Sequence, residues 1–390
     1  MKSLHILFIL DHFFPYIGGG EVLFWELTRG LVRSGHKVTV ITSHFDQTLS
    51  KHETIEGVEV IRVGKNRIGF QLLGAIKAIN YCKKYHIDII HGTSFFGLIP
   101  AWIVKIRTRI ITIVTIHEVY GKLRFQFLGG LGIINYLYEW FCINILTFDN
   151  YICVSNYTKN SLRLMYGIPD YKLKTVYNGI DYDFRNPTQV DDIQICGLRT
   201  QYELQNNIIG LYFGRMGVAK GMDDVIKSLP HIVKLIPNYK QIFITPKKQP
   251  HSLFGFKNSF SVQEINDLIT SYGLTNNVLW LDVQNKEQLR IWIGLSDIVI
   301  LPSRAEGFGF AVSEVCALGK PLVTTNVGSI PEVVYGKVNF VEPGNKEDIT
   351  RKVVGAIKGK YQIIAPKSFL WGECIESILD VYKKVLGKND

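Results

Sequence analysis

The sequence predicts an α/β protein built from two doubly wound, Rossmann-like domains. Short apolar runs alternate with segments of helical spacing along most of the chain, and this alternation starts again after a polar stretch near the middle. A length of 390 residues fits two to three domains, and 47% hydrophobic residues can fill cores of that size. Alternating strands and helices indicate parallel sheets covered on both faces. Ligands of such sheets bind beyond the carboxyl ends of the strands, so function is expected in the loops that follow strands.

The first domain is expected to span residues 1–190. Residues 4–10 form an apolar run that is too short for a signal peptide and ends at Asp11 without a cleavage site, so we interpret it as the first strand. Residues 21–34 have helical spacing and end at a glycine, which is typical of a helix C-terminus. Residues 71–85 predict an amphipathic helix. Further strands are expected at residues 37–42, 58–63, 87–91, 110–117, 150–155 and 174–177.

One apolar stretch, residues 127–148, is long enough to cross a bilayer. Its only charged residue is Glu139, but Asn135 and Asn144 also interrupt it and three glycines weaken its first part. We therefore expect a long helix that is buried or lies at a membrane surface, rather than a membrane span.

The second domain is expected to span residues 207–366, after a polar linker at residues 181–207. Its strands are expected at residues 208–214, 241–245, 278–281, 298–301, 321–325 and 339–341. Residues 367–390 are expected to form a last segment, with an apolar stripe along a helix at 368–386. We expect this helix to cross back and lie at the domain junction.

The most informative segment is residues 303–314, which places Glu306 and Glu314 eight residues apart around a Gly-x-Gly turn. A buried strand precedes the turn, and a helix pattern over about residues 310–318 follows it. Free backbone N–H groups and the positive end of a helix dipole at such a turn attract an anion, most often a phosphate. Carboxylates accept hydrogen bonds from hydroxyl groups, so the segment fits a nucleotide-sugar. The alternative is a plain strand–helix unit with solvated glutamates, because a lone Gly-x-Gly is weak evidence.

Cations and glycines follow the first strand of each predicted domain. Arg215 and Lys220 lie in a glycine-rich loop after residues 208–214, where they can pair with a diphosphate. The loop is not a Walker motif, and two solvated cations are the alternative. Gly18 and Gly19 open a helix after the first strand, where the backbone can approach a ligand closely. Their run lacks the dinucleotide fingerprint, so a turn without a ligand is the alternative.

His117 ends a predicted strand, where an imidazole could bind a sugar hydroxyl or assist the development of charge. A lone histidine is more often structural, and no serine or cysteine triad is recognisable. The six cysteines show neither a Cys-x-x-Cys pair nor zinc spacing, which predicts reduced thiols of a cytoplasmic protein and no metal site.

The net charge of +10 is concentrated in residues 65–124. This window has ten basic residues against Asp88 and Glu118, and aromatic residues are mixed among them. Such a composition favours contact with an anionic membrane surface, with a solvated basic face as the alternative. No nucleic acid is expected, because no binding motif accompanies the charge. The basic residues are Lys65, Arg67, Lys77, Lys83, Lys84, Lys105, Arg107, Arg109, Lys122 and Arg124.

Taken together, these motifs resemble glycosyltransferase family 4, the retaining glycosyltransferases of the GT-B fold. The resemblance covers nearly the whole chain. Its strongest part is Glu306 and Glu314 in their setting, followed by Gly214-Arg215 with Lys220-Gly221. Further matching segments are residues 18–21, 154–155, 178–181, 328–332 and 369–382. The chain departs from the family pattern at residues 245–250, where a glycine-rich turn is usual, and at Glu118 and Ser329.

The resemblance implies roles for the candidate residues of the second domain. Glu306 would bind hydroxyls of the donor sugar near the reacting carbon, and Glu314 would hold the ribose hydroxyls. Arg215 and Lys220 would neutralise the leaving diphosphate. Backbone N–H groups of the turn would add to this stabilisation, at Gly307, Phe308 and Gly309.

In the first domain, the resemblance implies that Gly18 and Gly19 approach the diphosphate and that His117 lies near the donor sugar. The implied reaction is transfer of a hexose with retention, from a nucleotide-sugar to a lipid-linked glycan or a precursor of a surface polysaccharide. No metal or other cofactor is expected. The protein would act in the cytoplasm, with a peripheral position on the inner face of the plasma membrane. A nucleotide-sugar epimerase of the same fold and a non-enzymatic binding protein are the alternatives.

Overall fold

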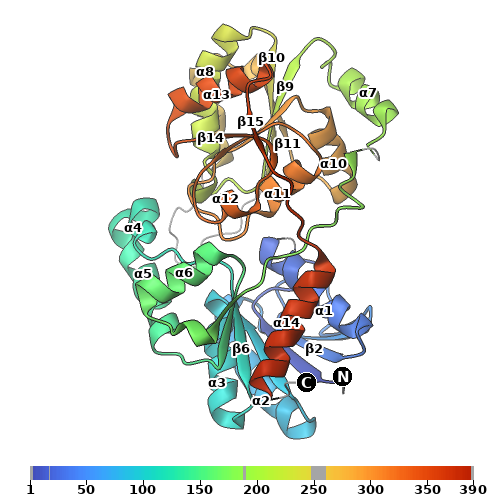
Figure 1. Ribbon diagram of the computed structural model, residues 1–390, viewed down its shortest axis with the longest axis vertical. Coiled ribbons are helices and arrows are strands. Elements are labelled where there is room, and N and C mark those ends of the chain that lie inside the picture. Colours follow the sequence, from blue (N-terminus) through green and yellow to red (C-terminus); the bar gives the residue numbers. More distant parts are fainter. Residues whose placement is uncertain (1–2, 17, 188–189, 247–260, 388–390) are drawn as a thin grey trace. The chain divides into compact units, whose positions relative to one another are not determined.

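The computed structural model describes residues 3–16, 18–187, 190–246 and 261–387. The chain divides into two compact units, each with its own core (Figure 1). Unit 1 contains residues 1–122, 133–179 and 369–390, and unit 2 contains residues 123–132 and 180–368. Each unit is a largely parallel sheet with helices, so the predicted pair of doubly wound α/β folds is confirmed.

Unit 1 has an eight-stranded sheet in the order β3-β4-β2-β1-β5-β6-β7-β8. Only the edge strand β3 runs antiparallel to its neighbour. The central strand β1 pairs with β2 on one side and β5 on the other, so the direction of winding reverses between β1 and β5. The strands are β1 (His5–Leu10), β2 (Lys37–Ser43), β3 (His52–Ile55), β4 (Val58–Val63), β5 (Ile89–Thr93), β6 (Thr112–Ile116), β7 (Asn150–Cys153) and β8 (Leu173–Thr175).

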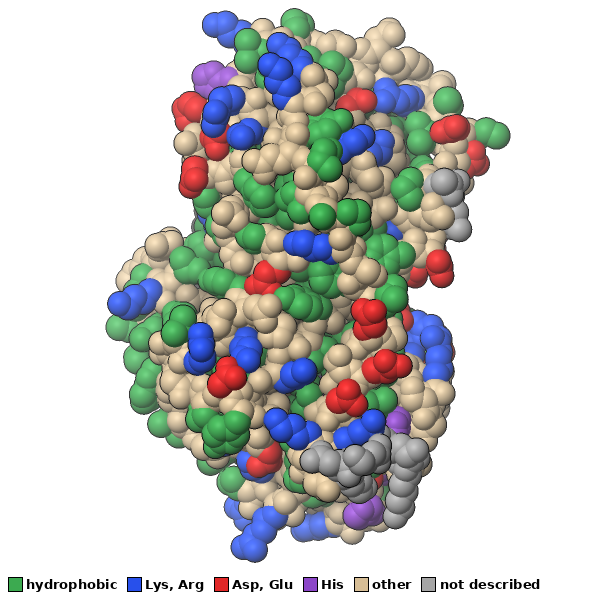
Figure 2. Space-filling view, in the orientation of Figure 1, with side chains coloured by type: hydrophobic (Ala, Val, Ile, Leu, Met, Phe, Trp, Pro, Cys, Tyr) green, Lys and Arg blue, Asp and Glu red, His purple; other side chains and the backbone are tan. Residues whose placement is uncertain are grey.

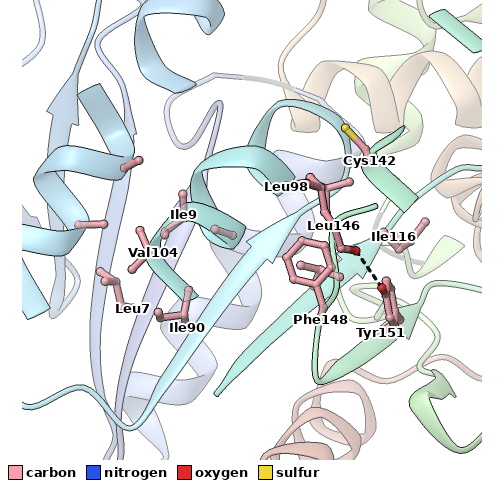
Figure 3. Packing of buried hydrophobic residues seen from close by; sticks show 14 of the residues in the cluster. Leu7, Ile9, Ile90, Leu98, Val104, Ile116, Cys142, Leu146, Phe148 and Tyr151 are labelled. Carbon is pink, nitrogen blue, oxygen red and sulfur yellow. Dashed lines mark hydrogen bonds between the residues drawn. The ribbon is translucent and has the colours of Figure 1, made fainter. Parts of the chain in front are cut away.

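The core of unit 1 is continuous between the sheet and its helices. Strands β1 and β5 are buried along their whole lengths, because helices cover both faces of a parallel sheet. Figure 3 shows Leu7 and Ile9 of β1 in one cluster with Val104 of α3, together with Leu146 and Phe148. The helices are α1 (Gly19–Arg33), α2 (Arg67–Lys84), α3 (Leu98–Thr108), α5 (Gly132–Asn144), α6 (Asn156–Tyr166) and α14 (Trp371–Val385).

The expectation of a single long helix at residues 127–148 is wrong. Helix α4 (Leu123–Leu128) and a 3₁₀ turn at Gly129–Leu131 precede α5. The break occurs at Gly129, whose φ of +57° is in the left-handed region that no continuous helix contains. Among the described residues, no helix is both long and apolar enough to cross a membrane.

Helix α14 belongs to unit 1, which confirms the predicted return of the C-terminal helix. It packs closely on α1, since a Cβ atom on Gly30 would lie 2.1 Å from Cδ1 of Ile375. Farther along α14, the hydroxyl of Tyr382 lies 2.6 Å from Nδ1 of the fully buried His91 in β5. The sequence therefore completes its first unit with its last helix.

Unit 2 has a seven-stranded sheet in the order β11-β10-β9-β12-β13-β14-β15, in which β15 alone is antiparallel. Its central strand β9 pairs with β10 and with β12, so the winding reverses between β9 and β12. The strands are β9 (Ile208–Phe213), β10 (Tyr239–Ile244), β11 (Val278–Leu281), β12 (Ile298–Leu301), β13 (Leu322–Thr325), β14 (Gly336–Val341) and β15 (Gln362–Ile364).

The helices of unit 2 follow its strands in the predicted alternation. The segment expected as the linker contains a helix, α7, whose first turn is capped by the side chain of Asp191. Besides α4, which also lies in unit 2, the helices are α7 (Asp192–Gln201), α8 (Met222–Leu235), α9 (Val262–Ser271), α10 (Lys286–Leu295), α11 (Phe310–Ala317), α12 (Ile330–Val333) and α13 (Lys346–Ile357).

Candidate functional site

The loops after β9 and β12 meet at the point where unit 2 reverses its winding, the usual ligand position of an open α/β sheet. The backbone N–H groups of Arg304 and Ala305 both donate to the carbonyl of Ala219, at 2.7 and 3.3 Å. Gly221 is required at this contact, because its φ is +67° and a Cβ atom would lie 2.2 Å from the carbonyl oxygen of Pro302. The two loops therefore form one continuous surface.

Arg304 fixes this junction with its side chain, a role that sequence reasoning missed. Its guanidinium donates to the carbonyl of Val218 at 2.8 Å and to Asp223 and Asp224 at 2.9 and 2.6 Å. Burial alone would raise the pKa of Asp223, but hydrogen bonds from Arg304 and Lys227 hold that pKa below its usual value. The start of α8 is thus tied to the loop that carries the candidate carboxylate.

Lys220 and Glu306 form an ion pair at the centre of this junction. Nζ of Lys220 lies 2.8 Å from Oε2 of Glu306, and the two side chains are only 23% and 14% exposed. The hydroxyl of Ser303 donates to the same carboxylate oxygen at 3.3 Å. A cation and a carboxylate are therefore held together at the carboxyl ends of β9 and β12, in partly desolvated surroundings where their fields are stronger than in water.

The loop after β13 supports the backbone of Glu306 from the other side. The N–H of Ser329 donates to the carbonyl of Glu306 at 3.2 Å. A Cβ atom on Gly328 would lie 2.2 Å from the same carbonyl oxygen, so only glycine permits this approach. The sequence signal for this support was the segment at residues 328–332, although its contact with Glu306 was not foreseen.

The glycine turn after Glu306 leads directly into α11. Gly309 is the N-cap of α11 with a φ of +94°, and Phe308 is buried against the ring of Phe310. Within the described residues, the backbone N–H groups of Gly307 and Gly309 donate to no protein acceptor. Amide groups at the N-terminus of a helix suit an anion such as a phosphate.

Glu314 lies one turn into α11 and is paired with Arg185, which sequence reasoning assigned to the linker. Nη2 of Arg185 lies 2.5 Å from Oε1 of Glu314, and Arg185 is only 4% exposed. Its other terminal nitrogen, Nη1, is buried without a hydrogen-bond partner in the described structure. The guanidinium groups of Arg185 and Arg290 both lie over the ring of Phe184, at 4.9 and 4.6 Å from its centroid.

The side chain of Arg215 is not brought into this cluster. It is exposed after β9 and makes no hydrogen bond or ion pair to the residues that the structure describes. Its carbonyl accepts a hydrogen bond from the hydroxyl of the buried Tyr212 at 3.1 Å, which fixes the backbone of the loop. The guanidinium is therefore presented to solvent at the strand end.

Unit 1 brings its own candidate residues together near the reversal between β1 and β5. Gly18 is the N-cap of α1 and Gly19 its first residue. The next glycine, Gly20, lies against His117, since a Cβ atom there would be 3.2 Å from Nε2. Nε2 of His117 also lies 3.1 Å from the hydroxyl of Thr93, and burial lowers the pKa of His117 to about 4. The imidazole is therefore neutral near pH 7.

A second polar group at the end of β1 was not singled out from the sequence. Oδ2 of Asp11 lies 3.1 Å from Nε of Arg67; burial raises the pKa of Asp11, and Arg67 opposes that rise. His12 stacks on Tyr16 at 4.2 Å, and burial together with Arg67 lowers its pKa to about 3. The available signal was the position of Asp11 and His12 directly after the first strand.

No group of three or more His, Cys, Asp or Glu side chains is placed to hold a metal ion in the described ranges. The segment at residues 245–250, where the chain departs from the family pattern, begins with Thr245, whose hydroxyl accepts from the indole of Trp280 at 2.7 Å. Residues 247–250 lie outside the described residues.

Two family models match the chain and together cover most of it. The model for Glycosyltransferase Family 4 matches residues 17–184, and the model for Glycosyl transferases group 1 matches residues 198–365. An uncharacterised glycosyltransferase of Methanocaldococcus jannaschii is 26% identical over 86% of this chain and 84% of that protein. The GPI3 subunit of phosphatidylinositol N-acetylglucosaminyltransferase from Saccharomyces cerevisiae is 24% identical over 98% of this chain and 83% of that protein. The structure of Anabaena HepE with UDP and glucose shares the fold, with a TM-score of 0.75 and 20% identity over 97% of this chain and 99% of that one.

Proposed function

The chain belongs to the family 4 and group 1 glycosyltransferases of the GT-B fold, and from that premise we propose that it transfers a sugar from a nucleotide-sugar to a glycan acceptor, with retention of the anomeric configuration. The observation that carries this proposal is the ion pair between Lys220 and Glu306 at the reversal of the unit 2 sheet. It offers a cation for a diphosphate and a carboxylate for sugar hydroxyls within one hydrogen-bond length. The complex of HepE with UDP and glucose supports a nucleotide donor of this kind.

The donor is proposed to extend from Glu306 along the start of α11. The diphosphate would lie at the N–H groups of Gly307, Phe308 and Gly309, where the helix dipole adds positive potential. Glu314, farther along α11, would accept hydrogen bonds from the ribose hydroxyls. Arg215 would reach the diphosphate from its exposed position, because an arginine side chain that no described protein partner restrains is available to a ligand.

Unit 1 is proposed to serve the same reaction through Gly18, Gly19 and His117. The glycines at the start of α1 permit close approach of a phosphate to the backbone. His117 would donate or accept a hydrogen bond at a sugar hydroxyl in its neutral form, since its pKa is about 4.

The proposed chemistry breaks the bond between the anomeric carbon and the diphosphate oxygen, whose electron pair leaves with the diphosphate. The acceptor hydroxyl attacks the same face of the sugar and passes its proton to the leaving diphosphate. Negative charge grows on the diphosphate in the transition state, where Lys220, Arg215 and the amide groups stabilise it most. Glu306 is paired with Lys220 in the structure, which favours a binding role over that of a nucleophile.

The acceptor is proposed to be a lipid-linked glycan or a precursor of a surface polysaccharide, used at the cytoplasmic side of a membrane. The phosphatidylinositol in the name of the Saccharomyces cerevisiae relative supports a lipid acceptor. A nucleotide-sugar epimerase is not favoured, because both family models and the relatives named above are glycosyltransferases.

Thermal unfolding with a panel of nucleoside diphosphates and nucleotide-sugars tests the donor site. A ligand that binds only the native state raises the melting temperature, and a concentration of a hundred times Kd contributes about 2.7 kcal/mol. One nucleoside diphosphate and its sugar derivative are expected to raise the melting temperature in the native chain but less in Lys220→Gln. Lys358→Gln, an exposed substitution after α13, is the matched control. Absence of any shift, or equal shifts in both variants, would contradict the proposed site.

A further inference from the structure

Helix α2 exposes an apolar stripe that no described residue of unit 1 covers. Ile68, Leu72, Leu73 and Ile76 recur at helical spacing on one side of the helix, and each is at least 47% exposed. The opposite side of the helix carries Phe70 and other residues of the core. An amphipathic helix normally turns its polar side to water, so an exposed apolar stripe on the outer side of α2 marks a site of interaction.

Helix α5 repeats the same arrangement. It exposes Ile133, Ile134, Leu137, Trp140 and Phe141, each by at least 41%, while Cys142 and Ile143 face the core. Figure 2 shows apolar side chains gathered over the region of α5. A tryptophan among aliphatic side chains on an exposed helix is typical of segments that lie at a membrane–water interface.

The two stripes lie on helices that approach each other near the N-terminus of α2. Tyr138 of α5 interacts with the side chain of Gln71 of α2, and its ring lies 5.9 Å from that of Phe96. The guanidinium of Arg67, at the start of α2, lies over the same Phe96 ring at 5.1 Å. We call the exposed residues of α2 and α5 named above the α2–α5 surface.

The exposed charges on helices α2, α3 and α5 have one sign. Helices α2, α3 and α5 contain a single acidic residue, Glu139, which is 2% exposed. Its carboxylate is turned inward, where it accepts hydrogen bonds from the N–H of Gly121 at 2.7 Å and the hydroxyl of Tyr166 at 2.6 Å. Exposed basic residues without an ion pair to the described chain lie on α2 and at the end of α3: Lys77, Lys83, Lys84, Arg107 and Arg109.

We propose that the α2–α5 surface docks on an anionic lipid bilayer, with its apolar side chains among the acyl chains and its cations at the headgroups. Apolar burial and attraction to anionic lipid act together in such binding. A second copy of the chain is a poorer occupant, because it would bring the lysines of both surfaces together. This inference rests on side chains of unit 1 and is independent of the sugar that the enzyme transfers.

Co-sedimentation with vesicles tests the proposal, using phosphatidylcholine with and without phosphatidylglycerol. Binding is expected to require phosphatidylglycerol and to weaken with salt. The triple variant Lys77→Gln, Lys83→Gln, Lys84→Gln is expected to lower the partition coefficient on the order of a hundredfold, from the usual contribution of each cation. Its control carries the same change at three exposed lysines of unit 2: Lys234, Lys286 and Lys358.

The apolar contribution has its own variants. Leu72→Ser with Ile76→Ser, and separately Leu137→Ser with Trp140→Ser, are each expected to lower binding at least about tenfold. The control is Ile193→Ser with Leu235→Ser, which removes side chains that are 80% and 62% exposed in unit 2. The four substituted positions are exposed, so the hydrophobic core is expected to be unchanged in these variants. Circular dichroism checks that the variants fold.

Brominated lipid provides an independent readout of depth. Tryptophan quenching is expected in the native chain and is expected to fall in Trp140→Phe, which keeps an aromatic ring but removes that fluorophore. Vesicle binding that survives the charge and serine variants would overturn the proposal. Light scattering that shows a dimer which the serine variants convert to a monomer would also overturn it, in favour of a second copy of this chain. A variant that loses nucleotide binding is expected to bind vesicles as the native chain does. A variant that loses vesicle binding is expected to bind nucleotide as the native chain does.

Discussion

Oε1 of Glu314 lies 2.5 Å from Nη2 of Arg185, although the two residues are 129 positions apart in the chain. The pair joins the segment before α7 to helix α11, and it involves the carboxylate that we propose as the ribose ligand. Arg185 is nearly fully buried, so its charge depends on Glu314 for compensation. The proposed nucleotide site and the stability of unit 2 therefore share one residue.

Glu314→Gln is expected to destabilise unit 2 by about 3 kcal/mol, because it leaves a buried guanidinium without its counter-charge. Urea denaturation measures this loss. Glu347→Gln on α13, where the carboxylate is 71% exposed and 3.9 Å from Lys346, is the control and is expected to change stability by less than about 0.5 kcal/mol. The double variant Arg185→Met, Glu314→Gln is expected to recover part of the loss, since no charge is then left alone. Equal stability of Glu314→Gln and the control would contradict the role of the pair.

Glu306→Gln is expected to lower kcat at least about a hundredfold while the circular dichroism spectrum is unchanged, because it removes the preorganised charge that we propose beside the reacting carbon. Glu287→Gln, an exposed position on α10, serves as the control for the loss of one carboxylate. Normal turnover of Glu306→Gln would remove Glu306 from the site. A glycosyl adduct on Glu306, detected by mass spectrometry of the trapped native enzyme, would instead exclude same-face attack.

Gly328→Ala is expected to lower both kcat and stability, because its Cβ atom would lie 2.2 Å from the carbonyl oxygen of Glu306. Gly336→Ala separates this clash from backbone strain. Gly336 has a similarly positive φ of +74°, but a Cβ atom there would meet nothing within 4 Å. The control is expected to cost about 1–2 kcal/mol with unchanged kcat, and Gly328→Ala about 2 kcal/mol more with kcat at least tenfold lower. Matching kinetics in the two variants would show that the contact does not position Glu306.

Stability is expected to fall on acidification below pH 6.5. Burial lowers the pKa of His91 and of His12 to about 3 and that of His117 to about 4, from an ordinary value of 6.5. Below pH 6.5 these histidines become protonated in the unfolded chain but stay neutral in the folded chain. Each histidine therefore lowers the free energy of unfolding by roughly 1 kcal/mol per pH unit until the pH reaches its folded pKa.

Urea denaturation between about pH 5 and pH 8 measures this slope. His91→Gln is expected to be less stable at neutral pH, because Tyr382 loses its buried partner, but to show a shallower dependence on pH. His231→Gln, an exposed position on α8, is expected to keep the original slope. An unchanged slope in His91→Gln would show that His91 is not a source of the acid sensitivity.

Most of the strands could be predicted from the sequence, because a strand buried on both faces has a continuous apolar run. The predicted limits of β4, β11 and β12 agree with the structure residue for residue. The edge strands β3 (His52–Ile55) and β15 (Gln362–Ile364) were not predicted, since they are short and mostly exposed, and exposed strands have no apolar pattern. The single helix expected at residues 127–148 was wrong, because the positive φ of Gly129 interrupts it.

The placement of Lys220 and Glu306 at the ends of strands could also be predicted, but not their 2.8 Å contact. That contact depends on β9 and β12 being neighbours in the sheet, although β10 and β11 separate them in the chain. The ion pairs of Arg185 and Arg304 could not be predicted for a similar reason. An arginine in a polar segment has the same pattern whether it is solvated or buried, and only the fold supplies the carboxylates that decide between the two.

The position of α14 in unit 1 has a consequence for the order in which a nascent chain folds. Unit 2 is complete at residue 368, but unit 1 still lacks the helix that contains Ile375 and Tyr382. While the ribosome is still adding that helix, Gly30 of α1 has no Ile375 to pack against and His91 has no hydroxyl partner from Tyr382. The domain that is translated first is thus the last to be finished, and a chain stopped before residue 371 would release a folded unit 2 attached to an open unit 1.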